Sequence, residues 1–348
     1  MENLIIREIL PNEIKAVHSL GVHAFKGFES LFVSKAKHAF VAVLDEQIVG
    51  AILYKFINVN HKKIGYIDYA YTSANHHGLG IGNALYKTTT DNLFEMGCDA
   101  LTAVVKDDNV ASWSLFMKNK FSRVSLIDIV QHFGVIGALK NYFLTPLCYG
   151  VGMEYYIASK EAIVSHSKNN STRQLIAYFL VNFFVILIPL FLNPKDALSL
   201  GSAYLLLLLM NVIFEFIGSR FSLNRNWKFR LNNGGILVSL FINLFSIFPM
   251  IGNWYPSKYE KNKDFQKDMG ITALTGWIAL LFITVIAAFS GIDSTFIRIL
   301  GQISVYFLIY KCIPFYPFES MGGRRVYNWN KVVYFIMFAL SILIIINS

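Results

Sequence analysis

The second half of the chain contains apolar runs that are long enough to cross a bilayer. LIAYFLVNFFVILIPLFL (175–192) and LSLGSAYLLLLLMNVIFEFIG (198–218) both approach the roughly 20 residues that a membrane-spanning helix needs. Up to about residue 170, in contrast, apolar residues alternate with charged ones, so the 55% hydrophobic content is concentrated late in the sequence. We predict a soluble domain over residues 1–165 and an all-α, polytopic membrane domain over residues 171–348.

Charge divides in the same way. Residues 1–170 hold 16 Lys and Arg against 15 Asp and Glu, whereas residues 171–348 hold 15 against 7. The later basic residues lie in loops between apolar runs, which favours a cytoplasmic position for those loops rather than a nucleic-acid partner. The N-terminus MENLIIREILPNE lacks the apolar core of a signal peptide, so we expect a multi-pass protein of the cell membrane with a cytoplasmic first domain.

Six apolar runs predict five or six membrane helices. If all six crossed, the basic loops 220–233 and 254–268 would face opposite sides, which the positive-inside rule disfavours. A re-entrant segment over 234–253, bent at Pro249 and Gly252, places both loops inside, so we prefer five spans plus this segment. The runs fall near 174–192, 199–219, 234–253, 270–290, 296–314 and 331–347.

The soluble half has a mixed α/β pattern. Apolar alternation predicts strands, and apolar residues at helical spacing predict the helices between them. Helices are expected at 11–25, 83–97 and 109–120, and strands at 3–10, 64–72, 100–108, 121–128 and 152–160, with a hairpin over 39–59 that turns at Asp45 and Glu46.

The stretch HHGLGIGNALY (76–86) carries three glycines on alternate positions between a predicted strand and a predicted helix. A strand, a glycine turn and a helix N-terminus together present unpaired backbone N–H groups and the positive end of the helix dipole, which suits a phosphate or pyrophosphate. A P-loop is excluded because no Lys follows the last glycine, and the dinucleotide spacing fails because Asn83 stands where it needs glycine.

Two motifs about 30 residues apart resemble those of the GNAT acetyltransferases. Residues 77–82, HGLGIG, are similar to the acyl-CoA signature Q/R-x-x-G-x-G/A, with His77 in the first position. NVASWSLFMKNKF (109–121) is similar to the second motif, N-x-x-A-x-x-L-Y-x-K-x-G-F. It keeps Asn109, Leu115, Lys118 and Phe121 and departs at Ser112, Phe116 and Lys120. The resemblance covers about residues 1–160 and implies an α/β GNAT fold, a mixed central sheet flanked by helices.

The resemblance implies acetyl-CoA as co-substrate and no metal. The amides from Gly78 to Asn83 would hold the pyrophosphate, and the strand before the turn would pair with the pantetheine arm and polarise the thioester carbonyl. The implied coenzyme-binding residues are Ala70, Tyr71, Thr72, His77, Gly78, Leu79, Gly80, Ile81, Gly82, Asn83, Asn109 and Phe116.

An acceptor amine must lose a proton before it attacks the thioester. We favour Asp68 as the base; the alternative is a solvated or salt-bridged carboxylate on an open strand face. Phe116 stands where relatives carry the Tyr that protonates the leaving thiolate, so water, Tyr86 or another hydroxyl must replace it, or the domain binds the coenzyme without efficient turnover. His76 and His77 are candidate proton shuttles, although histidines at a turn more often face solvent or phosphate.

The segment VQHFGVIGALKNYFLTPLCYGVG (130–152) is an apolar insertion, mainly over 130–150, broken by glycines and Pro146. One interpretation is a flap that rests in the bilayer interface and lines the acceptor site. An ordinary hydrophobic connection to the membrane domain explains the same pattern.

The membrane half contains the stretches NVIFEFIGSR (211–220) and IPFYPFESMGG (313–323), each with one acid among apolar residues. They resemble the HExxH motif and the ligand-Asp stretch of a degenerate site-2 protease-like metallopeptidase, in which Phe214 and Gly218 occupy the zinc-histidine positions and Glu319 that of the ligand Asp. All eight histidines lie at or before His166, and Glu215 and Glu319 alone cannot form a hydrolytic zinc site. We expect no active protease; Glu215, an acid within a span, is a candidate binder of an amine or cation, or a neutral or Arg-paired residue near the helix end.

These patterns favour a membrane-anchored N-acetyltransferase that transfers acetyl from acetyl-CoA to an amine at the cytoplasmic membrane surface. Its expected partners are the lipid bilayer and an acceptor amine, which can be a lipid headgroup, a lipid-linked amino sugar or a protein amine. The alternative is a membrane pseudo-peptidase that senses acyl-CoA or binds a substrate without catalysis.

Overall fold

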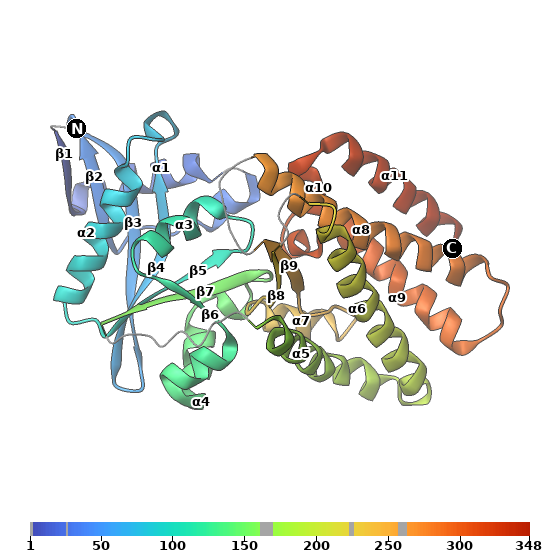
Figure 1. Cartoon of the computed structure of the whole chain (residues 1–348). Helices are drawn as coiled ribbons and strands as arrows, with labels where there is room; N and C mark the ends of the chain where they lie inside the picture. The colour runs from blue at the N-terminus through green and yellow to red at the C-terminus, as the bar shows by residue number, and fades with distance from the viewer. Residues whose placement is uncertain (1–2, 26, 161–169, 223–225, 257–262) are drawn as a thin grey trace. The chain divides into compact units, whose positions relative to one another are not determined.

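The computed structural model describes residues 3–25, 27–160, 170–222, 226–256 and 263–348 (Figure 1). The chain divides into two compact units. Unit 1 comprises Met1–Pro146 and Glu154–His166, and unit 2 comprises Leu147–Met153 and Ser167–Ser348. A short segment of unit 2 therefore interrupts the sequence of unit 1.

Unit 1 is built on a seven-stranded mixed sheet in the order β1-β2-β3-β4-β5-β7-β6. The strands β1 to β4 are antiparallel to their neighbours, β5 runs parallel to β4, and β6 is antiparallel to β7. The strands are β1 (Leu4–Glu8), β2 (His38–Leu44), β3 (Gln47–Val59), β4 (Lys62–Thr72), β5 (Ala100–Lys106), β6 (Ser122–Val124) and β7 (Met153–Ser159).

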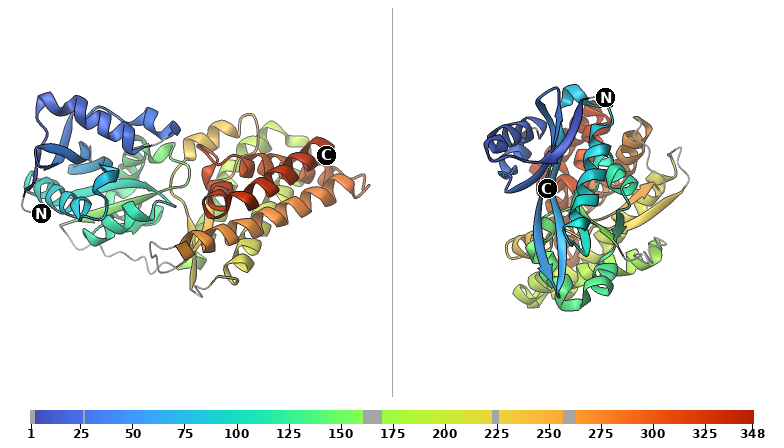
Figure 2. Two further views of the ribbon diagram at one scale, coloured as in Figure 1. Left: turned by 90° about the horizontal axis from the view of Figure 1, so that it is seen from above. Right: turned by 90° about the vertical axis from the view of Figure 1, so that its left-hand side faces the viewer.

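Helices cover both faces of this sheet, and α1 and α2 lie on opposite sides of it (Figure 2). Strand alternation explains why: Val41 and Val43 of β2 and Ala51 and Leu53 of β3 pack in one cluster with Val17 of α1. The alternate residues of both strands therefore face the other side of the sheet. The predicted α/β class with flanking helices is confirmed for this unit. The helices are α1 (Ile14–Ala24), α2 (Ile81–Glu95), α3 (Val110–Lys118) and α4 (Leu126–Leu144).

Two tight turns shape the long β2–β3–β4 meander. Asp45 and Glu46 join β2 to β3 with φ of 46° and 65°, and Asn60 and His61 join β3 to β4 with φ of 47° and 65°. Two consecutive left-handed residues make the turn whose twist matches antiparallel strands. The turn predicted at Asp45 and Glu46 is therefore present.

The predicted strand 121–128 is shorter than expected, because β6 ends at Val124 and a helix begins. Ser125 accepts a hydrogen bond from the amide of Asp128, whose carboxylate accepts one from the amide of Ser125, so the two residues cap α4. Most of the apolar insertion 130–150 belongs to α4, whose helical path bends at Gly134 (φ 70°).

Unit 2 consists mainly of helices. By length and composition, three apolar helices of the described chain can cross a membrane, over Ser171–Leu192, Pro194–Ser219 and Asp264–Phe289, and the apolar helix Lys331–Asn347 is shorter. The helices are α5 (Ser171–Leu192), α6 (Ala197–Ser219), α7 (Ile236–Ile242), α8 (Lys263–Phe289), α9 (Thr295–Cys312), α10 (Gly323–Trp329) and α11 (Lys331–Asn347).

A two-stranded antiparallel sheet in unit 2 is absent from the sequence prediction. It pairs β8 (Trp227–Leu231) with β9 (Gly252–Pro256), and residues 232–251 between the two strands contain the short helix α7. The side chain of Asn243 holds the following loop, since its amide donates to the carbonyl of Phe248 (2.7 Å) and its oxygen accepts from the amide of Phe248 (3.1 Å). The buried side-chain amide thus forms hydrogen bonds with backbone N–H and C=O groups that, in a continuous helix, would bond to one another.

Candidate functional site

The glycine turn leads into α2 with an open helix N-terminus. Gly78 and Gly80 have φ of 86° and 75°, values that residues with a Cβ rarely adopt, and no side chain caps the helix. The first backbone amide with a partner here is that of Ala84, which donates to Gly80 (3.1 Å). Within the described residues, the amides of 78–83 have no acceptor, so this end of α2 has the donors that an anion needs.

A β-bulge interrupts β4 at Asp68. Leu53 of β3 lies opposite Tyr69, whereas the next residue, Tyr54, lies opposite Ile67, so Asp68 has no partner on β3. A bulge bends its strand and re-aims a side chain.

The pairing of β4 with β5 ends just before the bulge. The parallel register runs from Ile64 opposite Ala100 to Ile67 opposite Ala103, and in the described part of the chain it does not continue into 68–72. The last five residues of β4 therefore have one edge that β5 does not occupy. An extended ligand arm can pair with such an edge.

Asp68 is half-buried, and its carboxylate accepts a hydrogen bond from the hydroxyl of Ser34 (Oγ to Oδ2, 3.3 Å). Burial raises the pKa of Asp68, while the positive charge of Lys55 and the Ser34 hydrogen bond lower it in part. A carboxylate with a raised pKa holds a proton more strongly than a solvated one. This property suits a general base.

The predicted strand residues Ala70, Tyr71 and Thr72 lie between the bulge and the glycine turn. Tyr71 is buried, and its hydroxyl donates to the carbonyl of Val17 (2.8 Å), so its side chain belongs to the core under α1. A Cβ on Gly82 would lie 4.0 Å from Cγ2 of Thr72. The end of β4 and the start of α2 are thus adjacent, as a ligand that spans both requires.

Two predicted residues of the second motif have structural roles. The side chain of Asn109 accepts a hydrogen bond from the amide of Ser112 (3.1 Å) and caps α3. Phe116 is 3% exposed, and its ring packs 4.8 Å from Tyr86 and 4.9 Å from Phe121. Contact of either side chain with a coenzyme stays a prediction.

The remaining predicted residues of the turn differ in exposure. His77 and Leu79 are exposed, Ile81 is buried and anchors α2, and the amide oxygen of Asn83 accepts a hydrogen bond from Asn119 (3.3 Å). Burial raises the pKa of Tyr86, which makes its hydroxyl a weaker acid.

Sequence reasoning missed Ser34, Lys55 and Asn119. Ser34 lies 34 residues before Asp68, in the segment between two elements, and no motif marks it. Lys55 reaches the same region because the hairpin register pairs it with Tyr66, near the bulge. The turn at Asp45 and Glu46 was predicted from the sequence, but the pairing of β3 with β4 and its one-residue shift at Asp68 were not.

In unit 2, Glu215 is 1% exposed and lies in a buried polar chain. Its carboxylate accepts a hydrogen bond from the amide of Asn211 (3.2 Å), and Lys311 donates to the oxygen of the same amide (3.2 Å) and to the carbonyl of Met321 (2.9 Å). Glu319 pairs with Arg324. No group of three His, Cys, Asp or Glu side chains in the described ranges could hold a metal ion.

Residues 6–121 match the model of the acetyltransferase (GNAT) family. Unit 1 has the GNAT fold. The match covers about a third of the chain and includes the glycine turn, the bulge at Asp68 and α3. A search of curated proteins gave no match.

Solved structures of acetyltransferases are similar to this chain at low identity. The N-acetylglutamate synthase from Neisseria gonorrhoeae, complexed with coenzyme A and N-acetyl-glutamate, is 16% identical and aligns over 45% of this chain and 35% of its own, with a TM-score of 0.33. The IAA acetyltransferase from Bacillus cereus is 17% identical over 45% of this chain and 99% of its own, with a TM-score of 0.32. Naa50 from Arabidopsis thaliana, in complex with a bisubstrate analogue, is 14% identical over 45% and 99%, with a TM-score of 0.34.

Proposed function

We propose that this protein is a membrane-anchored N-acetyltransferase that uses acetyl-CoA and acts on an amine at the cytoplasmic membrane surface. The observation that carries this proposal is the set of unpartnered amides at 78–83, at the uncapped start of α2 and next to Thr72. The family match over residues 6–121 supports the same activity.

Each part of the site has a role in this reaction. The amides of 78–83 bind the pyrophosphate, and the edge of β4 after Asp68 that β5 does not occupy pairs with the pantetheine arm. The bound coenzyme supplies the acetyl group as a thioester. A backbone amide of this edge stabilises the negative charge that develops on the carbonyl oxygen.

Asp68 takes the proton from the acceptor amine, whose nitrogen then forms a bond to the acetyl carbon while the carbon–sulfur bond breaks. The sulfur leaves as a thiolate and takes a proton from water or from Tyr86. Because the side chain of Tyr86 is buried and packs against Phe116, we favour water.

Unit 2 supplies the membrane anchor in this proposal. Its three long apolar helices have the length and hydropathy of membrane spans, and the excess of basic residues after residue 171 favours a cytoplasmic position for the connecting loops and the GNAT domain. The acceptor is then an amine held near the cytoplasmic surface: a lipid headgroup, a lipid-linked amino sugar or a protein amine.

A second candidate function is acyl-CoA sensing or substrate binding without catalysis. Phe116 supports it, because this ring lies in a buried aromatic cluster and offers no hydroxyl to a leaving thiolate. The family match ends at residue 121, so the likeness of unit 2 to a degenerate metallopeptidase remains a hypothesis without further support.

A thiol-release assay on the full chain separates the two functions. The protein is given acetyl-CoA with pooled membrane lipids or soluble amines, and free thiol is measured for the native chain, Asp68→Asn and Gly80→Glu. Asp91→Asn, an exposed acid on α2, and Gly97→Glu, a left-handed glycine after α2, are the matched controls. Release that only the first two changes abolish supports the enzyme, whereas tight coenzyme binding without release from any amine supports the sensor.

A further inference from the structure

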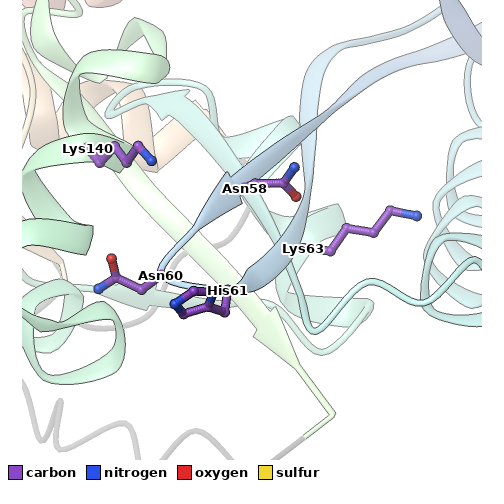
Figure 3. A pocket seen from close by; sticks show the side chains of 5 residues that line it. All are labelled: Asn58, Asn60, His61, Lys63 and Lys140. Carbon is purple, nitrogen blue, oxygen red and sulfur yellow. The ribbon is translucent and has the colours of Figure 1, made fainter.

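The turn between β3 and β4 forms a pocket with α4, apart from the residues of the proposed acetyl-transfer site. The pocket has a volume of about 490 Å³ (Figure 3). Residues from the hairpin and one lysine from α4 line it: Asn58, Asn60, His61, Lys63 and Lys140.

The hairpin turn is fixed to the bend of α4. The side-chain amide of Asn60 donates to the carbonyl of Phe133 (2.5 Å), directly before Gly134. Gly137, one turn further, leaves the space that Asn60 occupies, since a Cβ there would lie 2.5 Å from Nδ2 of Asn60. The pocket is therefore a built feature of unit 1 rather than a gap beside a free turn.

The pocket is basic, because two lysines and a histidine line it and no acid does. The ammonium of Lys63 is held by the carbonyl of Met96 (2.8 Å) and lies 4.3 Å from the ring centre of Phe56. Lys140 has no partner in the part of the chain that the structure describes, and in Figure 3 its side chain extends from α4 toward the hairpin. Because the Lys63 ammonium is directed to Met96 and Phe56, Lys140 and His61 are the groups of this lining that suit an anionic oxygen ligand.

The outward face of α4 next to this pocket is apolar. Val135, Ile136, Leu139 and Phe143 are between 55% and 76% exposed. At 3.6 residues per turn they occupy about 100° of the helix surface, and Lys140 lies about 40° beyond them on the rim. Gly137, Ala138 and Asn141 on the other side of the helix are buried.

An apolar helix face bordered by a lysine matches the interface of a bilayer, where acyl chains meet charged headgroups. A soluble phosphate explains the pocket but not the four exposed apolar side chains beside it. Leu147, three residues after α4 ends, belongs to the same unit as the three long apolar helices. Anionic phospholipid is therefore the occupant that satisfies the charge and the apolar surface together.

We propose that α4 and the β3–β4 turn form a docking site for anionic phospholipid. The lipid phosphate binds in the pocket at Lys140 and His61, and the acyl chains lie against Ile136, Leu139 and Phe143. The site holds the GNAT domain on the membrane surface. This inference rests on the membrane anchoring in the proposed function, and not on acetyl transfer.

The test uses the full chain in nanodiscs with a lipid-borne quencher. An environment-sensitive fluorophore is attached at Ile136→Cys, because the three native cysteines are buried. We expect quenching that increases when phosphatidylglycerol is added to phosphatidylcholine. Lys140→Gln is expected to weaken this dependence on anionic lipid about fivefold, which is the change in lipid binding expected from the loss of one basic group near the membrane surface. The control Lys87→Gln changes an exposed lysine on α2 and leaves the dependence unchanged.

A second label separates this proposal from the anchoring itself. Phe282→Cys lies in α8 with a 65% exposed side chain and reports membrane insertion of unit 2. Quenching at Phe282→Cys without quenching at Ile136→Cys overturns the docking site and leaves the anchor in place, whereas absence of both overturns the two proposals together. Two further outcomes overturn the proposal. If inorganic phosphate binds the pocket in detergent with the same affinity as the lipid, the site belongs to a soluble anion. If the label at Ile136→Cys becomes buried with rising protein concentration in the absence of lipid, the site belongs to a second copy of the chain.

Discussion

The hydroxyl of Ser34 donates a hydrogen bond to the carboxylate of Asp68 (3.3 Å), and Asp68 is the bulge residue of β4 that has no partner on β3. The bulge directs the carboxylate toward the segment that follows the helix-turn Gly27–Phe32, where Ser34 lies. The proposed base is thus oriented by a residue from a different part of the sequence.

Removal of the Ser34 hydroxyl is expected to shift the acid limb of the pH–rate profile. Since this hydrogen bond lowers the pKa of Asp68, Ser34→Ala raises that pKa further, and kcat/KM falls at a higher pH than in the native chain. Lys55→Gln acts in the same direction because it removes a positive charge, and Ser34→Thr retains the native profile. Identical profiles for all variants would show that Asp68 is not the titrating base.

Asp68→Asn should abolish turnover without loss of stability. The pKa of Asp68 is higher in the folded protein than its ordinary value. The protonated carboxyl group therefore contributes stability that is complete below the unfolded pKa of about 4. This contribution is lost as the pH rises through the raised pKa of the folded state. At neutral pH the ionised carboxylate therefore costs stability, and the amide removes that cost. Denaturant unfolding at pH 7 checks this, and a clear loss of stability contradicts it.

Gly78 and Gly97 form a matched pair at the two ends of α2. Both have left-handed φ, 86° and 85°, and a Cβ at either position meets nothing within 4 Å. Alanine at each site should cost a similar 1–2 kcal/mol of backbone strain. Calorimetry with coenzyme A is expected to show weaker binding only for Gly78→Ala. Equal affinities for both variants would show that the glycine turn does not bind the coenzyme.

A double-mutant cycle can test the contact between the hairpin and α4. Gly137→Ala places a methyl group 2.5 Å from Nδ2 of Asn60 and should cost about 1–3 kcal/mol. Asn60→Gly removes the obstructing side chain and keeps the left-handed φ of 47°. We expect Gly137→Ala to be much less costly in the Asn60→Gly background, and additive free energies of unfolding would argue against the contact.

The buried chain Glu215–Asn211–Lys311 gives a prediction for unit 2. Lys311→Met removes one of the two positive charges near the buried Glu215 carboxylate, leaves only Arg325, and should destabilise the protein by about 3–5 kcal/mol. Lys311→Met with Glu215→Gln removes both charges and should recover part of this loss. Thermal unfolding in detergent measures both, and a double variant no more stable than the single one excludes the coupling.

Much of unit 1 was predictable because its local signals agree with its fold. The strand 64–72, the turn at Asp45 and Glu46, and the helix after the glycine turn follow from alternation, turn chemistry and helical spacing. The glycine turn also lies between strand β4 and helix α2, as the sequence predicted.

The remaining features depend on tertiary contacts. The bulge at Asp68 is a shift of one residue that apolar alternation does not reveal, and Ser34 reaches the site only through the fold. The segment 130–150 has glycines that suggest interruption, yet Ser125 and Asp128 start a helix there and Asn60 occupies the space at Gly137. In unit 2, β8 and β9 are separated by 20 residues of apolar sequence that hydropathy alone assigns to the membrane.

The path of the segment Leu147–Met153 has a consequence for biosynthesis. Its carbonyls accept hydrogen bonds from the amides of Gly235 and Gly234, and the side chain of Asn232 donates to Gly152, 80 residues earlier in the chain. Strand β7 begins at Met153, the last residue of this segment. The ribosome must therefore translate residues 232–235 of the apolar half before the loop that leads into β7 can form these hydrogen bonds. A message truncated after β7 would yield an acetyltransferase domain in which that loop lacks these partners.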